Sequence, residues 1–316
     1  MLFRSPYKNL INQLTLFQSE HFQKKAVWSE DETPDPRPEN PSLWLKKVLG
    51  IDRLDSMRSG KAIRVCEISQ KIQDGFVRQT FIIEDPLLGE FKVLILRPGR
   101  VTDDAPILVA NHGHGGTSDS FANRDIIGEL ATKNLIIVVP EYRAMLNDFE
   151  IKLSKSLFQR DIFLMGVRII ECLLSIDLAT KLFPGTRKLA MIGHSGGSMT
   201  SLLASWILGK VEACIIDHQA DFKLAWINFC CEGIPPLQNA LTWLYSPQPI
   251  FSLKSFPYNF VPEEEELIQF IQAALSLEGT NQRVEPSKWK TPTLIQISQR
   301  AAKKFLEIDQ IGRAHV

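Results

Sequence analysis

Ser195 lies in a glycine-rich run, residues 193–197 (GHSGG), which fits the pattern G-x-S-x-G. In that pattern a sharp turn between a strand and a helix exposes the serine hydroxyl, which can then act as a nucleophile. The flanking sequence fits, because residues 188–193 are typical of a buried strand and residues 198–208 of a helix. A glycine-rich turn could instead bind a phosphate, but the G-x-G-x-x-G pattern and a P-loop lysine are both missing. We therefore predict that Ser195 is a nucleophile.

A second glycine-rich stretch, residues 112–116 (HGHGG), follows an apolar run that is typical of a strand. Acyl transfer needs main-chain N–H groups aimed at the substrate oxygen, and glycine lets a backbone approach closely. One donor normally follows the nucleophile and the other comes from an earlier loop. We predict an oxyanion hole formed by Gly113, His114 and Gly196, with the N–H groups of His114 and Gly196 as donors. The side chains of His112 and His114 are expected to orient the loop, and they lack the nearby partners that a metal site would need.

The elements around these motifs predict an α/β fold. Residues 62–98 contain three segments rich in β-branched residues, bounded by Gly, Pro and Asp, which indicate strands. After residue 105, short apolar strands alternate with helical patterns, as expected for strands that are buried on both faces. We predict a mostly parallel central sheet with helices on both faces.

The chain divides into three parts. Residues 1–41 are rich in proline and charge and are expected to form an arm and linker. Residues 42–310 are expected to form the folded domain, which begins with a helix over 43–54 capped by Ser42. Residues 311–316 (IGRAHV) match the translation of a common sequencing adapter, so we expect this tail not to be native protein.

Composition excludes several classes of protein. The 316 residues are 44% hydrophobic, enough for one large core or two smaller ones. The 36 basic residues balance 36 acidic ones, which argues against nucleic acid or an anionic membrane as a partner. We find no signal peptide and no apolar segment long enough to span a membrane. The five cysteines have no CxxC spacing, although Cys230 and Cys231 are adjacent, and a cytoplasmic protein is expected.

The motifs together resemble the α/β-hydrolases, and within them the acetyl-xylan-esterase-like and dienelactone-hydrolase-like branch. The resemblance extends over about residues 42–308 and is strongest over 105–220. It implies the α/β-hydrolase fold, hydrolysis of a small carboxylic ester or related acyl bond by a Ser-His-Asp triad, and no cofactor. The segments that carry it are LWLKKVLG (43–50), HGHGGTSDS (112–120), LIIVVPEYR (135–143) and KLAMIGHSGGSMTSLLAS (188–205).

The rest of the triad departs from the family pattern, in which an acid and then a histidine follow the serine along the chain. Only two histidines lie beyond Ser195, namely His218 and His315, and His315 belongs to the adapter-like tail. Where the family has its acid, residues 256–261 offer Asn259, and an amide cannot stabilise an imidazolium as a carboxylate does.

Asp217 and His218 lie just past the predicted strand that follows the Ser195 turn along the chain. The carboxyl end of that strand is expected to face the same crevice as Ser195, so the two residues are candidates for the acid and the base. A histidine and two solvated carboxylates at the rim of the sheet are the alternative. Three hypotheses stay open from the sequence: a serine hydrolase, a hydrolase-like protein that binds without turnover, and an esterase sequence altered by truncation or a frameshift near its end.

Overall fold

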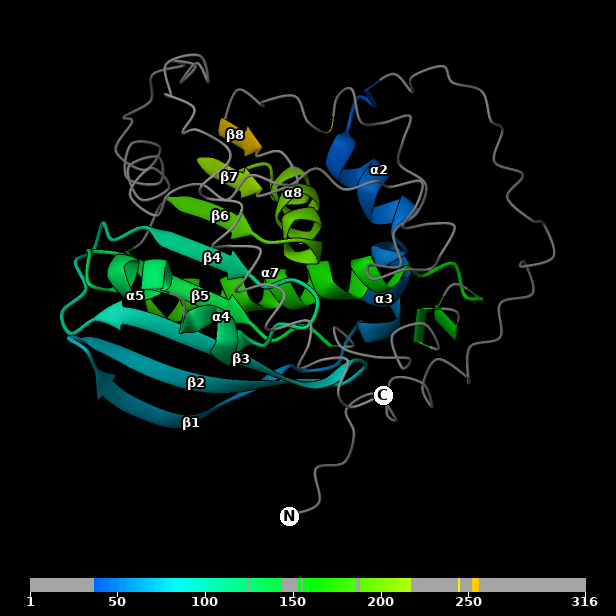
Figure 1. Ribbon diagram of the computed structural model, residues 1–316. Coiled ribbons are helices and arrows are strands. Elements are labelled where there is room, and N and C mark those ends of the chain that lie inside the picture. The colour runs from blue at the N-terminus through cyan, green and yellow to red at the C-terminus, as the bar shows by residue number, and fades with distance from the viewer. Residues whose placement is uncertain are drawn as a thin grey trace, which may run out of the picture.

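In the part of the chain that the computed structural model describes, one sheet of eight strands lies at the centre (Figure 1). The structure describes residues 37–123, 125–143, 153–154, 156–157, 159–185, 188–216, 244 and 252–255. In spatial order the strands are β1 (Arg64–Gln73), β2 (Phe76–Asp85), β3 (Gly89–Pro98), β5 (Ile136–Pro140), β4 (Ile107–Asn111), β6 (Leu189–Gly193), β7 (Ala213–Ile216) and β8 (Ser252–Ser255).

The sheet is parallel over only part of its width. β5, β4, β6, β7 and β8 run parallel, whereas β1, β2 and β3 pair antiparallel with one another, and β3 pairs antiparallel with β5. Five of the eight described strands run parallel, so the prediction of a mostly parallel sheet is confirmed for these strands, whereas the antiparallel pairing of β1, β2 and β3 was not predicted. The physical reason is the connection, since Asp74 and Gly75 join β1 to β2 with φ of 48° and 84°, and two residues can join only antiparallel strands.

Helices cover both faces of the sheet, as predicted (Figure 1). One face packs against α2 (Pro41–Val48), α3 (Ile51–Arg58), α7 (Leu164–Leu182) and α8 (Gly196–Leu208), and the other against α4 (Ser118–Ala122) and α5 (Asp125–Ala131). Successive side chains of a strand point to opposite faces, so each central strand contributes side chains to two hydrophobic cores. In β4, for example, Val109 lies in one core and Leu108 in the other. None of the described helices is long and apolar enough to cross a membrane.

The predicted helix over residues 43–54 is in fact two helices, α2 and α3. The side chain of Asn40 caps α2, whereas the Ser42 hydroxyl donates instead to the Ile207 carbonyl of α8 at 2.7 Å. The break falls at Gly50, which has φ of 74° and so close a neighbour that an added Cβ would lie 2.4 Å from the Asp161 carbonyl oxygen. Gly50 is therefore a left-handed glycine of the kind that commonly ends a helix, and the approach of Asp161 leaves no room for a side chain at this position.

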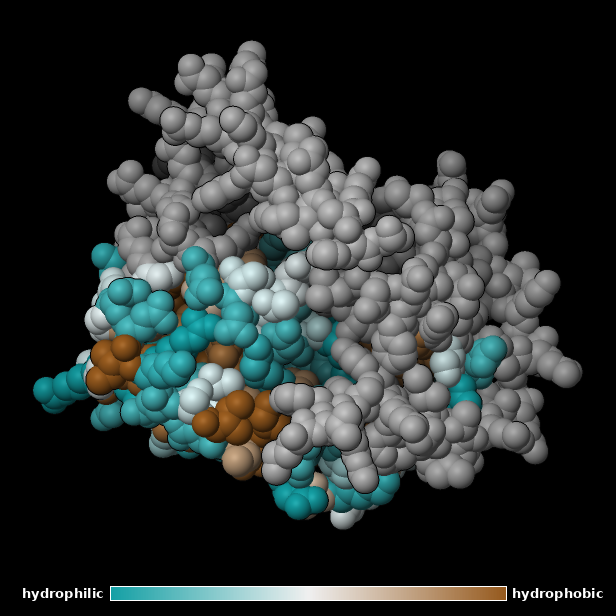
Figure 2. Space-filling view, turned by 60° about the horizontal axis from the view of Figure 1, so that its bottom comes forward, coloured by the Kyte–Doolittle hydropathy of each residue, from teal (hydrophilic) through white to brown (hydrophobic). Residues whose placement is uncertain are grey.

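β1 lies at one edge of the sheet and is exposed along almost its whole length. A bulge between Glu67 and Ser69 interrupts its pairing with β2, and exposed Val65, Ile68 and Ile72 are interspersed with polar residues. The face seen in Figure 2 is mainly hydrophilic with separate apolar patches where the chain is described. Bulges and charged residues are common devices that protect a sheet edge from pairing with another chain.

Candidate active site

Ser195 stands between the end of β6 and the first residue of α8, at the carboxyl end of a central parallel strand. Its backbone has φ of 52° and ψ of −121°, and it is one of three non-glycine residues with positive φ in the described part of the chain. Such a conformation costs free energy for an L residue and persists only where the surroundings enforce it. The strained turn lifts Ser195 out of both the strand and the helix.

Glycines at 193 and 197 allow this turn because no side chain fits at either position. An added Cβ on Gly193 would lie 2.2 Å from the Gly197 carbonyl oxygen. An added Cβ on Gly197 would lie 2.0 Å from the carbonyl oxygen of Asn111, the last residue of β4. The start of α8 is thus in direct backbone contact with the end of β4. A hydrogen bond joins the same region, because the His194 N–H donates to the Asn111 carbonyl at 3.1 Å.

The loop of residues 112–117 runs from β4 to α4 and packs against this turn. An added Cβ on Gly113 would lie 2.7 Å from Cβ of Ser195 and 2.6 Å from the His194 carbonyl oxygen. Within the loop the Gly116 N–H donates to the Gly113 carbonyl at 3.1 Å, and Gly115 takes φ of 67°. The structure therefore brings the two glycine-rich motifs, which are 80 residues apart in sequence, into contact at one edge of the sheet (Gly113 to Gly193).

His112 is buried beneath the loop and both of its ring nitrogens have backbone partners. Nε2 accepts from the Tyr142 N–H at 3.0 Å, and Nδ1 lies 3.1 Å from the Gly113 carbonyl oxygen. Burial lowers the pKa of His112, so the neutral ring is favoured, with its proton on Nδ1. The geometry matches a side chain that orients the loop, and His112 has no ring nitrogen left to act as a base.

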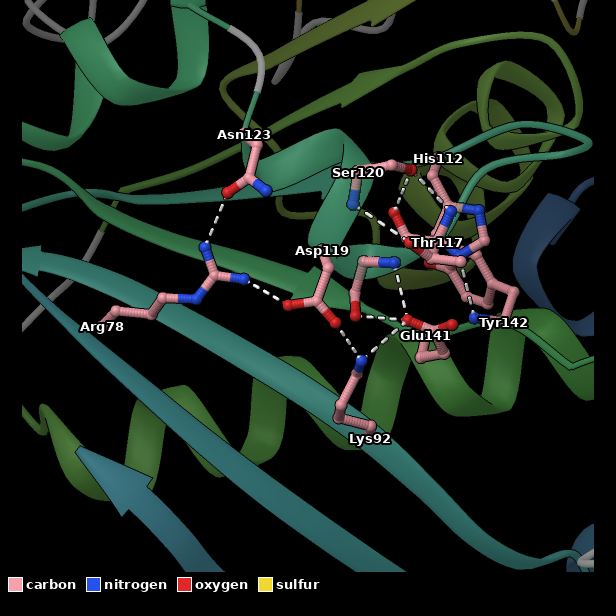
Figure 3. A network of polar contacts seen from close by, with 10 residues as sticks. Arg78, Lys92, His112, Thr117, Asp119, Ser120, Asn123, Glu141 and Tyr142 are labelled. Carbon is pink, nitrogen blue, oxygen red and sulfur yellow. Dashed lines mark hydrogen bonds and ion pairs between the residues drawn. The ribbon is translucent and has the colours of Figure 1, made fainter. Parts of the chain in front are cut away.

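Glu141 and Tyr142, at the carboxyl end of β5, contact the loop and are not among the predicted site residues. Glu141 accepts from the N–H of Ser118 at 2.6 Å and also from the Ser118 hydroxyl. Lys92 bridges Glu141 and Asp119, at 3.5 and 2.5 Å, as Figure 3 shows. The available signal was position, since both residues directly follow a fully buried parallel strand, and catalytic sites of such sheets lie at the carboxyl ends of the strands.

The candidate acid and base, Asp217 and His218, lie in a part of the chain that the structure does not describe. Asn259 also lies outside the described residues, as do Cys230, Cys231 and the tail of residues 311–316. β7 ends at Ile216, which pairs with Gly193 of β6, so the chain leaves β7 at the same edge of the sheet as Ser195. Within the described ranges, no three His, Cys, Asp or Glu side chains gather closely enough to hold a metal ion.

Comparison with known proteins gives a likeness in structure only. No protein-family model matches the sequence, and no curated protein matches it. An acetyl xylan esterase from Paenibacillus sp. R4 superimposes with a TM-score of 0.55 at 13% identity, covering 77% of this chain and 97% of that chain. Acetyl xylan esterase 1 from Thermoanaerobacterium sp. JW/SL YS485 gives a TM-score of 0.51 at 13% identity, covering 77% and 95%. At this identity the likeness establishes a common fold.

Proposed function

The chain has the α/β-hydrolase fold, and from this premise we propose that it is a serine hydrolase that cleaves carboxylic esters, with Ser195 as nucleophile. One observation carries the proposal: the backbone of Ser195 is strained at a strand-to-helix turn and directly contacts a glycine-rich loop. Acyl transfer requires a hydroxyl beside main-chain N–H donors, and the contact between Ser195 and the loop supports that role.

In the proposed reaction the Ser195 hydroxyl oxygen attacks the acyl carbon of the ester. The N–H groups of His114 and Gly196 stabilise the negative charge on the carbonyl oxygen, and Gly113 leaves room for it because it has no side chain. The ester C–O bond then breaks and the alcohol leaves with the proton that the base took from Ser195. Water, deprotonated by the same base, attacks the acyl-enzyme, which releases the carboxylic acid and restores the Ser195 hydroxyl. His218 is our candidate for the base that takes the proton from Ser195, and Asp217 is our candidate for its orienting acid.

Acetyl esters are the first substrates to test, because both acetyl xylan esterases are covered over nearly their whole length. We expect the purified protein to hydrolyse p-nitrophenyl acetate and Ser195→Ala to lower kcat by about 10⁴-fold or more. Ser205→Ala is a matched control on the same helix, since Ser205 is buried and its hydroxyl donates only to backbone and sulfur acceptors that the structure describes. It should leave hydrolysis unchanged.

Labelling with an activated phosphonate separates the nucleophile from the rest of the triad. The probe should modify Ser195 and no other serine, as located by peptide mass spectrometry, because the oxyanion donors act even where the base is poor. Hydrolysis at the background rate together with labelling of Ser195 would indicate a protein that binds without turnover. Hydrolysis that is unchanged in Ser195→Ala, or a label on another residue, would refute the proposed nucleophile.

A further inference from the structure

The segment that follows β5 holds both ends of the loop of residues 112–117. At the first end, the Tyr142 N–H donates to Nε2 of His112 and the Tyr142 hydroxyl donates to the Asn111 side-chain oxygen. At the second end, the Glu141 carboxylate accepts from Ser118, the first residue of α4. Two adjacent residues therefore tie the end of β4 and the start of α4 to the same strand end (Figure 3).

The contacts at the first end fix a peptide plane in the loop. Because Nε2 of His112 accepts a hydrogen bond, the neutral ring carries its proton on Nδ1 and donates to the Gly113 carbonyl at 3.1 Å. The Gly116 N–H donates to the same carbonyl at 3.1 Å. In a trans peptide the carbonyl and the following N–H point in opposite directions. Two donors on the Gly113 oxygen thus also set the direction of the His114 N–H.

The contacts at the second end keep the loop from turning as a whole. Glu141 accepts from the N–H of Ser118, one of the N–H groups of α4 that have no partner within the helix. Thr117 caps α4, because its hydroxyl oxygen accepts from the Ser120 N–H. Lys92 on β3 lies 3.5 Å from the same carboxylate oxygen and stabilises its charge. A loop of six residues held at both ends by hydrogen bonds has little freedom to rotate.

The segment is itself anchored in the core, so it can serve as a fixed support. Arg143, the next residue, is buried and forms an ion pair with buried Glu171 of α7. Its guanidinium also donates to the Leu88 carbonyl between β2 and β3. Through this segment the loop is anchored to the strand ends and to α7 rather than to solvent-exposed structure.

We infer that Glu141 and Tyr142 are positioning residues that aim the His114 N–H at the reacting carbonyl oxygen. This inference rests on the proposed function. Neither residue takes part in bond breaking, and each acts through the loop. Their loss should impair stabilisation of the transition state and leave substrate binding intact, because the oxyanion forms only during the reaction.

The test compares Glu141→Ala with Glu141→Gln and with Asp119→Asn as the matched control. Asp119 belongs to the same polar network but pairs with Arg78 and Lys92 and makes no described side-chain contact with the loop. We expect Glu141→Ala to lower kcat for p-nitrophenyl acetate by about 10-fold to 100-fold with KM unchanged. Glu141→Gln should recover part of the rate, because an amide oxygen still accepts from Ser118. The control should keep the wild-type kcat.

Hydrogen exchange separates this inference from the proposed function. In Glu141→Ala the amides of residues 113–118 should exchange about 10-fold faster, whereas the strands should be unchanged and Asp119→Asn should match the wild type. Exchange at the wild-type rate in Glu141→Ala overturns the inference even if the enzyme hydrolyses esters. A wild-type chain without Ser195-dependent hydrolysis overturns the proposed function, and exchange in the loop then still decides whether Glu141 holds it. A fall in kcat that is equal in Glu141→Ala and Asp119→Asn would also overturn the positioning role.

Discussion

Gly197→Ala should push the start of α8 away from the end of β4 and so separate the two halves of the proposed oxyanion hole. The added Cβ would lie 2.0 Å from the Asn111 carbonyl oxygen and 2.7 Å from the His112 carbonyl oxygen. Real Cβ atoms essentially never approach closer than 3.0 Å, so the backbones must separate by about 1 Å. Both neighbours are backbone atoms, and no side-chain rotation can relieve the contact.

The expected size of the effect follows from that displacement. A shift of about 1 Å near reacting atoms can cost about 10²-fold in rate, so kcat/KM for an acetyl ester should fall by that order. Overpacking costs about 1–3 kcal/mol of unfolding free energy, partly offset by the better helix propensity of alanine. Gly113→Ala, with its nearest contact at 2.6 Å, should follow the same direction with a smaller loss of stability.

The assay measures p-nitrophenyl acetate hydrolysis and thermal unfolding of each variant beside Gly128→Ala. Gly128 lies in α5 and has nothing within 4 Å of an added Cβ, so its variant should keep wild-type activity and gain about 0.5–1 kcal/mol of stability. A Gly197→Ala protein that unfolds at the wild-type temperature and hydrolyses esters at the wild-type rate would show that the start of α8 and the end of β4 are not in this contact.

Three further predictions concern buried side chains, namely Asp85, Cys172 and His112. Asp85 is buried and its carboxylate lies 2.7 Å from Arg58, so Asp85→Asn should lower the unfolding free energy by about 1–3 kcal/mol in urea titrations, with hydrolysis unchanged. Burial raises the pKa of Cys172 to about 12, so iodoacetamide should label exposed Cys66 but not Cys172 in the folded protein, as peptide mass spectrometry can check. Burial lowers the pKa of His112 below its usual 6.5, so the unfolded chain binds a proton that the folded chain excludes, and stability present above pH 6.5 falls as the pH drops through the lowered pKa. His112→Gln should remove that part of the pH dependence, which urea unfolding at about pH 7.5 and about pH 5.5 measures.

Much of the secondary structure could be predicted from local pattern alone. The apolar run before the GHSGG motif and the helical period after it predict β6 and α8, and the structure has them at Leu189–Gly193 and Gly196–Leu208. The order of strands in the sheet was less accessible. β5 lies between β3 and β4 although it follows both in sequence, and the pattern of apolar residues within a strand does not encode its neighbours.

The local sequence determined where chemistry could occur, because glycine, serine and histidine at fixed short spacing constrain the backbone directly. The tight turn at Ser195 requires glycine at positions 193 and 197, because a side chain at either position would collide with the backbone. Only the tertiary structure decided which partners those residues meet. Glu141 and Tyr142 reach the loop because β5 inserts beside β4, and Asp161 lies so close to Gly50 that no side chain fits there. Such contacts depend on how distant segments pack. The free energy of that packing comes from contacts throughout the core, so the sequence of one segment does not determine it.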